Sequence, residues 1–452
     1  HGFGGRIIFE DVSFRLNKGE HIGLVGANGE GKSTFMKILT RNLIPDEGKI
    51  TWSNKVKVGY LDQFSSLTKG MTIRDTLKTA FIDMFKLEEE INNLYMTMGD
   101  MTWELYWVSN KYAFDEYKRD INKIKGIQVF NTIGNHDHEM AKGVVGDFDT
   151  VIKYKKTIAP TYYSFNIGKV HYIVLDDINC KNTGAGDSGS RVYDDFVVQE
   201  QLDWLKKDLS FVSTSTPLVI TMHAPLYNDS QNASLNNTSA FEEIVKPYTT
   251  HVWTGHTHKM YNVDKTSSNK IFEHNAGAVC ATWWWTGHWT SGLHLAQDGA
   301  PGGYSVINVS GTDFKWKFKG TGRDADYQFR TYDRNEIALT GDAYVASGKD
   351  KAKFEEAVGD WKNVDKGNYV YINVWNYDPK WEISVTENGT SLKVERVSAK
   401  DPLHLIAYNG QSPTGGFGTS VTKHLFRVQA SSATSTLEIK VTDRFGNVYT
   451  ES

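Results

Sequence analysis

The stretch Gly134-Asn135-His136-Asp137-His138 decides how most of this chain is interpreted, together with two later histidine groups. Those groups are Thr221-Met222-His223-Ala224-Pro225 and Gly255-His256-Thr257-His258. Each follows an apolar, β-branched run, and these runs predict strands over residues 127–133, 217–220 and 251–253. Loops at strand ends are where α/β sheets assemble their sites. Imidazole nitrogen with amide and carboxylate oxygen suits zinc, manganese or iron, so the three groups predict a metal site.

The three groups resemble the third, fourth and fifth motifs of the calcineurin-like metallophosphoesterases, in content and in order. In that family these motifs read Gly-Asn-His-Asp, a single His, and Gly-His-x-His. A candidate for the second motif, Gly-Asp, stands at Gly99-Asp100. The resemblance covers residues 96–330. It implies an α/β fold with the αββα sandwich of the family, and a small phosphorylated substrate.

The resemblance also implies a role for each motif residue. The implied metal ligands are Asp100, Asn135, His223, His256 and His258. Asp100 would bridge two ions, His258 would bind one of them, and the other three residues would complete the second. His136 would protonate the leaving group, with Asp137 orienting it. The metal would be a divalent transition ion (manganese, zinc or iron), and the residues do not choose among these.

The first family motif, Asp-x-His, is missing, because no such tripeptide occurs anywhere upstream of Asp100. Those two side chains supply most of the protein ligands of the ion that His258 would bind. One ion site is therefore predicted to be complete and the other only half built. Two-metal catalysis needs ions about 3.5–4 Å apart, so we expect hydrolysis to be impaired.

A different motif occupies the upstream region. Residues 26–33 fit the P-loop pattern G-x-x-x-x-G-K-[ST], between the apolar run 22–25, predicted as a strand, and the helix-like run 34–39. In such loops backbone N–H groups cradle phosphate, the lysine reaches the outer phosphates and the hydroxyl binds magnesium. The candidate nucleotide-binding residues are Gly26, Asn28, Gly29, Gly31, Lys32, Ser33, Thr34 and Gln63. Mg-ATP is the implied ligand.

Residues 1–95 resemble the beginning of an ABC-type ATPase cassette, with Gln63 as its Q-loop residue and Phe3 near adenine. The signature motif, the Walker B strand and the switch histidine of that family do not follow. We therefore expect no ATP hydrolysis. Residues 87–95 read as an ABC helix, which places the junction of two unrelated genes near 98–102. The sequence does not say whether this fusion is natural, engineered or an assembly error.

The C-terminal part of the chain has the alternating pattern of β-strands. Residues 369–375 alternate with period two, and residues 381–386 and 391–397 flank the turn 387–390, which predicts a hairpin. The region 331–452 is predicted to be a β-sandwich, with residues 351–358 as its one helical interruption. The aromatic run 283–289 and His274 precede this region. They could line a substrate pocket or pack in a core, and core packing is the commoner outcome for such residues.

Length and composition fit this organisation. At 452 residues the chain has room for three domains, predicted as 1–95, 96–330 and 331–452. A net charge of −4 gives no general attraction to nucleic acid, and no apolar run is long enough to span a membrane. Because the chain opens on His1, its true start is expected upstream. The phosphoesterase part resembles exported bacterial proteins and the ABC part cytoplasmic ones, so the sequence leaves localisation and oligomeric state open.

Three functional hypotheses remain from the sequence. The chain is an impaired metal-dependent phosphoesterase, an ATP-binding module without hydrolysis, or an inert fusion. Cys180 and Cys280 are either a disulfide or two free thiols, because the count of two does not choose.

Overall fold

The computed structural model describes residues 1–3, 6–17, 20–27, 29–53, 56, 58, 93–102, 113–184 and 192–451. The chain divides into two compact units, His1–Leu87 and Glu88–Ser452. Two of the predicted nucleotide-binding residues, Asn28 and Gln63, lie outside the described residues. Among the described residues, no helix combines the length and apolarity that a membrane span requires.

In the first unit the helix expected after the P-loop forms, but the strand expected before it does not. Helix α1 (Lys32–Leu39) begins directly after Gly31, and the short strands β1 (Gly2–Phe3) and β2 (Arg6–Ile7) pair antiparallel. The apolar run 22–25 has no strand partner among the described residues, and Val25 is 91% exposed. The strand prediction was therefore wrong, because an apolar parallel strand is stabilised by neighbours and helices on both faces.

The second unit is built on a six-stranded sheet in the order β11-β12-β10-β9-β6-β5. Its strands are β5 (Tyr163–Ile167), β6 (Val170–Val174), β9 (Leu218–Thr221), β10 (Thr250–Thr254), β11 (Tyr261–Lys265) and β12 (Ile271–Asn275). The four inner strands run parallel, and the two edge strands run antiparallel to their neighbours. The strands predicted before His223 and His256 are thus β9 and β10, which lie side by side.

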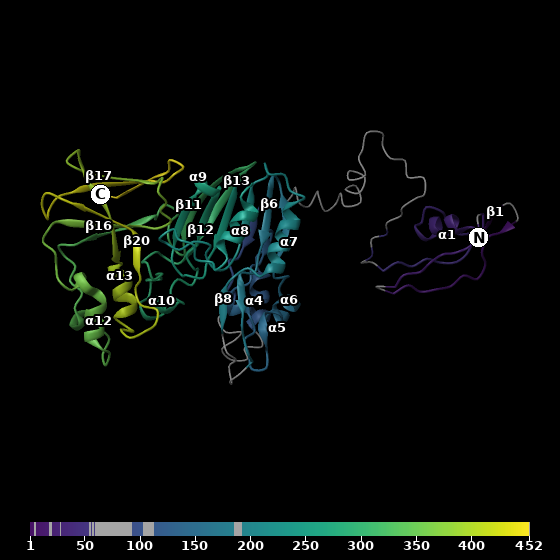
Figure 1. Cartoon of the computed structure of the whole chain (residues 1–452), viewed down its shortest axis with the longest axis horizontal. Helices are drawn as coiled ribbons and strands as arrows, with labels where there is room; N and C mark the ends of the chain where they lie inside the picture. The colour runs from purple at the N-terminus through teal and green to yellow at the C-terminus, as the bar shows by residue number, and fades with distance from the viewer. Residues whose placement is uncertain are drawn as a thin grey trace. The chain divides into compact units, whose positions relative to one another are not determined.

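Side chains of the parallel strands alternate between two cores, so both faces of this sheet are covered. Helices α7 (Gln199–Leu209) and α8 (Thr238–Val245) cover one face, where Ile220 packs with Leu205 and Phe241 (Figure 1). On the other face, Val219 and Trp253 pack in a core shared with two further strand pairs. These pairs are β3 (Leu94–Met96) with β4 (Gln128–Phe130), and β13 (Gly303–Ser310) with β14 (Asp313–Gly320).

Helices α4 (Ala113–Ile121) and α6 (Ile152–Thr157) complete the layering by packing Phe114 and Tyr154 against Ile133, which follows β4. This arrangement confirms the predicted α/β fold with helices outside two strand layers. One detail of the sequence interpretation was wrong. Residues 94–96 form strand β3, parallel to β4, and not the end of an ABC helix. Pairing with β4 gives this segment its hydrogen bonds, which local helix propensity cannot foresee.

The C-terminal part is the predicted sandwich of strands, drawn in green to yellow in Figure 1. One sheet has the order β15-β16-β20-β19 and the other β18-β17-β21-β22. The strands are β15 (Phe329–Asp333), β16 (Tyr369–Val374), β17 (Glu382–Glu387), β18 (Thr390–Leu392), β19 (Val394–Lys400), β20 (Val421–Gln429), β21 (Leu437–Thr442) and β22 (Val448–Glu451). Ile372 and Phe426 of the first sheet pack against Val385 and Ile439 of the second.

Two details of this part differ from the sequence interpretation. The predicted hairpin forms between β17 and β18, but its second arm ends at Leu392, and β19 joins the opposite sheet. Helix α12 (Lys351–Val358) is present as predicted, yet it is not the only helical segment. The others are α11 (Gly341–Tyr344), a 3₁₀ turn (Gly359–Lys362), α13 (Pro402–His404) and a π-helical turn (Leu405–Asn409).

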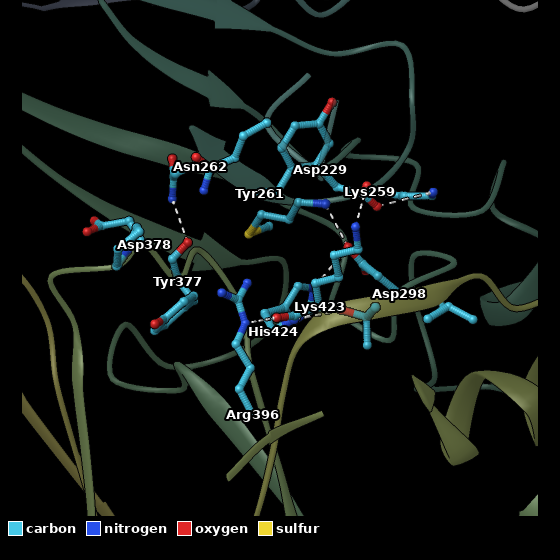
Figure 2. A pocket seen from close by; sticks show the side chains of 15 residues that line it. Asp229, Lys259, Tyr261, Asn262, Asp298, Tyr377, Asp378, Arg396, Lys423 and His424 are labelled. Carbon is cyan, nitrogen blue, oxygen red and sulfur yellow. Dashed lines mark hydrogen bonds and ion pairs between the residues drawn. The ribbon is translucent and has the colours of Figure 1, made fainter. Parts of the chain in front are cut away.

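The sandwich is joined to the six-stranded sheet through a polar junction. Asn262 of β11 donates from Nδ2 to the carbonyl of Asn376 at 2.8 Å, and Arg444 bonds Asp264 at 2.7 Å. Figure 2 shows a pocket in this junction, where Lys423 approaches Asp229 at 3.5 Å. Paired charges and backbone hydrogen bonds therefore bind the two parts of this unit to each other.

Candidate metal centre

Four polar side chains meet beyond the carboxyl ends of four strands. Asp100 follows β3, Asn135 begins the 3₁₀ turn η1 (Asn135–Asp137) after β4, His223 follows β9 and His256 follows β10. The parallel pair β3-β4 and the parallel neighbours β9 and β10 belong to two different sheets, and the carboxyl ends of both pairs meet here. Residues up to 156 positions apart in sequence therefore come together. The structure brings these four predicted ligands together.

The four potential ligand atoms are about as close as atoms that share one ion. His223 Nε2 lies 2.9 Å from Asn135 Oδ1 and 3.2 Å from Asp100 Oδ2. His256 Nδ1 lies 3.1 Å from both Asn135 Oδ1 and His223 Nε2. The Asp100, His223 and His256 ligand atoms all lie within 4.8 Å of one another. One small cation could contact all of them at once.

The hydrogen bond of His223 to the backbone indicates what its other nitrogen can do. Nδ1 lies 2.6 Å from the carbonyl oxygen of Met98, to which it donates its proton. In the neutral ring Nε2 then carries a lone pair, and it faces the oxygens of Asp100 and Asn135. A carbonyl that fixes the tautomer is the usual support of a metal-binding histidine. The donor set and its support therefore fit a divalent transition metal.

Two glycines make room for this arrangement. Gly99 has φ +90°, and a Cβ added there would overlap His223 Nδ1 and the backbone of Gly134. A Cβ added at Gly134 would overlap Asp100. Asp100 and His256 themselves adopt positive φ values of 54° and 64°, a conformation that costs free energy and clusters at functional sites. Close packing of the loops requires the Gly-Asp and Gly-Asn sequences.

Burial and mutual attraction set the charges of the centre. Burial alone would lower the pKa of His223, but the Asp100 carboxylate raises it to about 9. Burial alone would raise the pKa of Asp100, but His223 and His136 hold it below its usual value. Burial, together with His223, lowers the pKa of His256 to about 3. Without an ion, His223 is therefore protonated at neutral pH and paired with the Asp100 carboxylate, so a bound metal ion would take the place of its Nε2 proton. His256 remains neutral with a lone pair available.

An acid that the sequence interpretation missed supports the centre from behind. Asp177 accepts hydrogen bonds from the backbone amides of His223 at 2.9 Å and Ala224 at 2.8 Å. Burial raises the pKa of Asp177 to about 7. Asp177 follows the buried strand β6 and its neighbour Leu175, so it shows the same strand-end pattern as the other site residues. That pattern is the signal that could have found it.

His136 and Asp137 lie on the same turn as Asn135. The His136 amide donates to Asp100 Oδ1 at 2.9 Å, so the second and third motifs are hydrogen-bonded to each other. The Asp137 carboxylate accepts from the amides of Gly134 at 2.9 Å, Thr102 at 3.2 Å and Met101 at 3.3 Å. Burial, with Asp100 nearby, raises the pKa of Asp137 to about 7. Asp137 therefore fastens the loop that carries Asp100.

His258 has a different environment from the other predicted ligands. Its Nδ1 donates to the Ala281 carbonyl at 2.6 Å, and its ring stacks on Trp283 at 3.9 Å. Within the described part of the chain, His258 belongs to no close group of three potential ligands from His, Cys, Asp or Glu. The structure thus places Trp283 of the aromatic run beside a candidate ligand, but no second complete ligand set around His258.

The remaining sequence candidates lie elsewhere. His274 is buried in β12, stacked on Trp253 at 3.8 Å, so it is a core residue. Cys180 and Cys280 are both free thiols, which resolves the alternative of a disulfide. The pocket of Figure 2 includes Lys259, the residue after His258, but none of the four clustered ligands. It belongs to the junction with the sandwich.

In the first unit, side chains of the P-loop form hydrogen bonds with the backbone of the same loop. Lys32 Nζ donates to the carbonyls of Gly26 and Ala27, both at 2.6 Å, and Glu30 accepts from the Ala27 amide at 2.7 Å. Lys32, Ser33 and Thr34 form the first turn of α1, and Gly29 and Gly31 adopt positive φ. The lysine and one loop amide that would contact phosphate are therefore occupied by internal bonds.

Comparison with known families matches the chain to two different families. A model described as calcineurin-like phosphoesterase matches residues 73–260, and one described as its C-terminal region matches residues 273–449. Models of the calcineurin-like phosphoesterase family thus match two successive segments of the chain. An ABC transporter model matches residues 9–129, so the two families overlap across 73–129.

Individual relatives of the front part are ABC proteins. An uncharacterized ABC transporter ATP-binding protein of Bacillus subtilis, YfmM, is 64% identical over 100 residues, which is 22% of this chain and 19% of that protein. ABC transporter F family member 2 of Arabidopsis thaliana is 31% identical over 102 residues, or 22% of this chain and 15% of that protein. This chain therefore spans a fifth or less of these relatives.

Two solved structures are similar to about half of this chain at low identity. A dimetal phosphatase from Danio rerio is 13% identical with a TM-score of 0.31, covering 45% of this chain and 77% of that one. GAP50, the anchor in the inner membrane complex of Plasmodium, is 16% identical with a TM-score of 0.33, covering 54% and 79%.

Proposed function

We propose that the calcineurin-like region is a metal-dependent phosphoester hydrolase whose turnover is reduced by the missing Asp-x-His motif. The observation that supports this proposal most strongly is the convergence of Asp100, Asn135, His223 and His256 at the carboxyl ends of their strands. Their donor atoms are those that manganese, zinc or iron accept from proteins. A small phosphorylated compound is the proposed substrate.

The residues of the centre divide the work between holding the ion and moving a proton. Asp100, Asn135, His223 and His256 would hold the ion, which when bound polarises the phosphoryl group and activates water. His136, whose amide is fixed on Asp100 Oδ1, would donate a proton to the leaving oxygen. Asp137 and Asp177 would keep the two loops in place through their bonds to backbone amides.

The ligand set around His258 supports the proposal of reduced turnover. Hydrolysis by a pair of ions requires a second cation that contacts the attacking or leaving oxygen from the other side. Neither residue of an Asp-x-His motif is present to join His258. We expect a hydrolase that works mainly through one ion and is slower than relatives with all five motifs.

The first prediction separates metal binding from proton transfer. His256→Ala should lose about one ion per chain relative to the parent, and with it the hydrolysis of 4-nitrophenyl phosphate and bis-4-nitrophenyl phosphate. His136→Ala should keep the ion but lower kcat by roughly 10²–10⁴-fold, the usual contribution of a general acid. His21→Ala, an exposed residue of the first unit, serves as the matched control and should change neither quantity.

Replacing residues 1–92, which leaves β3 in place, with a strand that ends in Asp-x-His should raise turnover and metal content together. The proposal is wrong if the variant with the replaced segment hydrolyses neither substrate faster than the parent. It is also wrong if His136→Ala is as fast as the parent on both substrates.

A second proposal concerns the ABC-type region, which we infer binds Mg-ATP weakly without hydrolysing it. It is supported by helix α1, which begins at the P-loop lysine, and by the ABC family match over 9–129. The internal bonds of Lys32 would have to break before phosphate could bind, which weakens the affinity.

A further inference from the structure

A second group of potential metal ligands lies away from the predicted motif ligands. It consists of His138 after η1, Asp147 on α5 (Gly146–Thr150) and Cys180 at the end of β7 (Ile178–Cys180). One ligand atom of each residue lies within 4.8 Å of the other two. His138 is fully buried and Cys180 is 2% exposed. An imidazole, a carboxylate and a thiol thus converge in the interior of the fold.

The protonation of His138 makes this group unusual. Its Nδ1 lies 2.9 Å from the Gly134 carbonyl and donates its proton there. Within the described residues, Nε2 has no hydrogen-bond partner although it is completely buried. In the neutral ring this nitrogen carries a lone pair, and it faces Asp176 Oδ2 at 3.6 Å. Burial would lower the pKa of His138, but the nearby Asp176 and Cys180 raise it well above its usual value. Either a proton on Nε2 or a metal ion can therefore separate these two lone pairs.

The carboxylates around His138 are held in place by the backbone. The Cys180 amide donates to Asp147 Oδ1 at 2.8 Å, and the Ile178 amide donates to Asp176 Oδ1 at 3.2 Å. Each acid therefore has one oxygen anchored by an amide, and Asp176 directs its other oxygen at His138 Nε2. Anchored carboxylates and a carbonyl-bound imidazole are the outer contacts that orient metal ligands.

We propose that His138, Asp147, Asp176 and Cys180 form a buried structural site for a thiophilic divalent ion such as zinc. His138, Asp147 and Cys180 supply nitrogen, oxygen and sulfur within 4.8 Å of one another. Asp176 Oδ2, 3.6 Å from His138 Nε2, is the oxygen that would move in to complete a tetrahedral zinc site. Binding requires the thiol of Cys180 to lose its proton to solvent, so the bond formed is that between thiolate and zinc. The site would tie α5 and the β6–β7 connection to the turn that carries Asn135 and His136.

Cobalt is the probe that distinguishes this site from the phosphoesterase centre. Thiolate ligation of Co²⁺ gives a charge-transfer absorption band, which ligation by histidine, asparagine and carboxylate does not. The chain has only two cysteines, so Cys180→Ser and Cys280→Ser form a matched pair. The full chain is stripped with a chelator, reloaded with Zn²⁺ or Co²⁺, and examined for metal content and absorption.

We expect the parent and Cys280→Ser to bind about two ions per chain and to show the thiolate band. Cys180→Ser should lose the band and about one ion, whereas His256→Ala should lose about one ion and keep the band. Asp147→Asn, which leaves the thiol intact, should also lower zinc content if Cys180→Ser fails to fold.

The proposal is overturned if the parent shows no thiolate band, or if Cys180→Ser binds as much zinc as Cys280→Ser. Either result would leave His138 as an imidazolium paired with Asp176. Because His256→Ala reports only on the phosphoesterase centre, failure of the proposed hydrolase and failure of this site give different outcomes.

Discussion

At Gly99 the backbone passes so close to His223 that no side chain fits between them. Gly99→Ala would combine a strained positive φ with an overlap against His223 Nδ1, the atom that binds the Met98 carbonyl. The left-handed conformation alone costs an alanine about 1–2 kcal/mol, and moving His223 adds a loss of metal affinity. We expect Gly99→Ala to lower metal content and phosphatase activity at least tenfold (about the effect of losing a supporting contact).

Gly143→Ala is the control that distinguishes backbone strain from displacement of His223. Gly143 has φ +84° and no atom within 4 Å of an added Cβ, so it shares the strain but not the overlap. It should lower the free energy of unfolding without changing metal content, measured by thermal unfolding and elemental analysis. Equal metal content in the two variants would show that the close approach of Gly99 does not position His223.

Single residues were predictable wherever an apolar strand directly precedes a polar group. Asn135, His223 and His256 follow this pattern, and the structure places them together. Asp177 follows it too, but its partners are backbone amides of a distant loop, which no local pattern reveals. The same holds for Met98, whose carbonyl fixes the His223 ring. Contacts with backbone groups distant in sequence are therefore the part of the site that could not be predicted from the sequence.

At the scale of elements, the P-loop shows that a motif and its helix can form without the expected strand. The helix α1 is local, held by bonds between residues three or four positions apart, and a sequence pattern predicts it well. The run 22–25 depends on neighbouring strands, which the described part of this unit does not supply. The same dependence explains why residues 94–96 became a strand beside β4 instead of a helix.

This incomplete P-loop unit should bind nucleotide without turning it over. Hydrolysis needs a Walker B carboxylate and a signature motif to position water, and the sequence has neither. Phosphate release from ATP should therefore stay at the level of buffer for both the parent and Lys32→Ala. If Lys32→Ala abolished a steady ATPase activity of the parent, the interpretation would be wrong. A thermal shift with Mg-ATP that disappears in Lys32→Ala would show that nucleotide still binds.

At the scale of the whole molecule, the phosphoesterase region continues into the sandwich through shared buried contacts. His404 of the C-terminal part donates or accepts at both ring nitrogens, with Thr282 at 2.9 Å and Thr419 at 2.8 Å. Family matches over 73–260 and 273–449 agree that the two parts belong together. The sequence predicted both parts from strand periodicity, but not this contact between them, because Thr282 and His404 lie 122 residues apart along the chain.

His404 also makes the stability of this contact dependent on pH. Burial lowers the pKa of His404 to about 4, well below its value in an unfolded chain of about 6.5. The unfolded state therefore binds more protons than the folded state between these values. The contribution of the neutral His404 is fully present above pH 6.5 and is lost as the pH falls towards 4, by on the order of 1 kcal/mol per pH unit.

Because Gln remains uncharged, His404→Gln should remove this dependence. At pH 7.5 the variant should be less stable than the parent, by about 1 kcal/mol for the imperfectly replaced hydrogen bonds. Between pH 6.5 and 4 that difference should change by on the order of 1 kcal/mol per pH unit, because the parent loses stability that the variant never had. The variant should therefore become as stable as the parent within this range and more stable than the parent near pH 4. Urea unfolding followed by tryptophan fluorescence measures it, and comparing the two chains cancels the opposite pH dependence of buried acids such as Glu273, whose pKa burial raises to about 8. His21→Gln, at an exposed position, is the control. A difference that stays constant across this pH range would mean that His404 is not buried as a neutral ring.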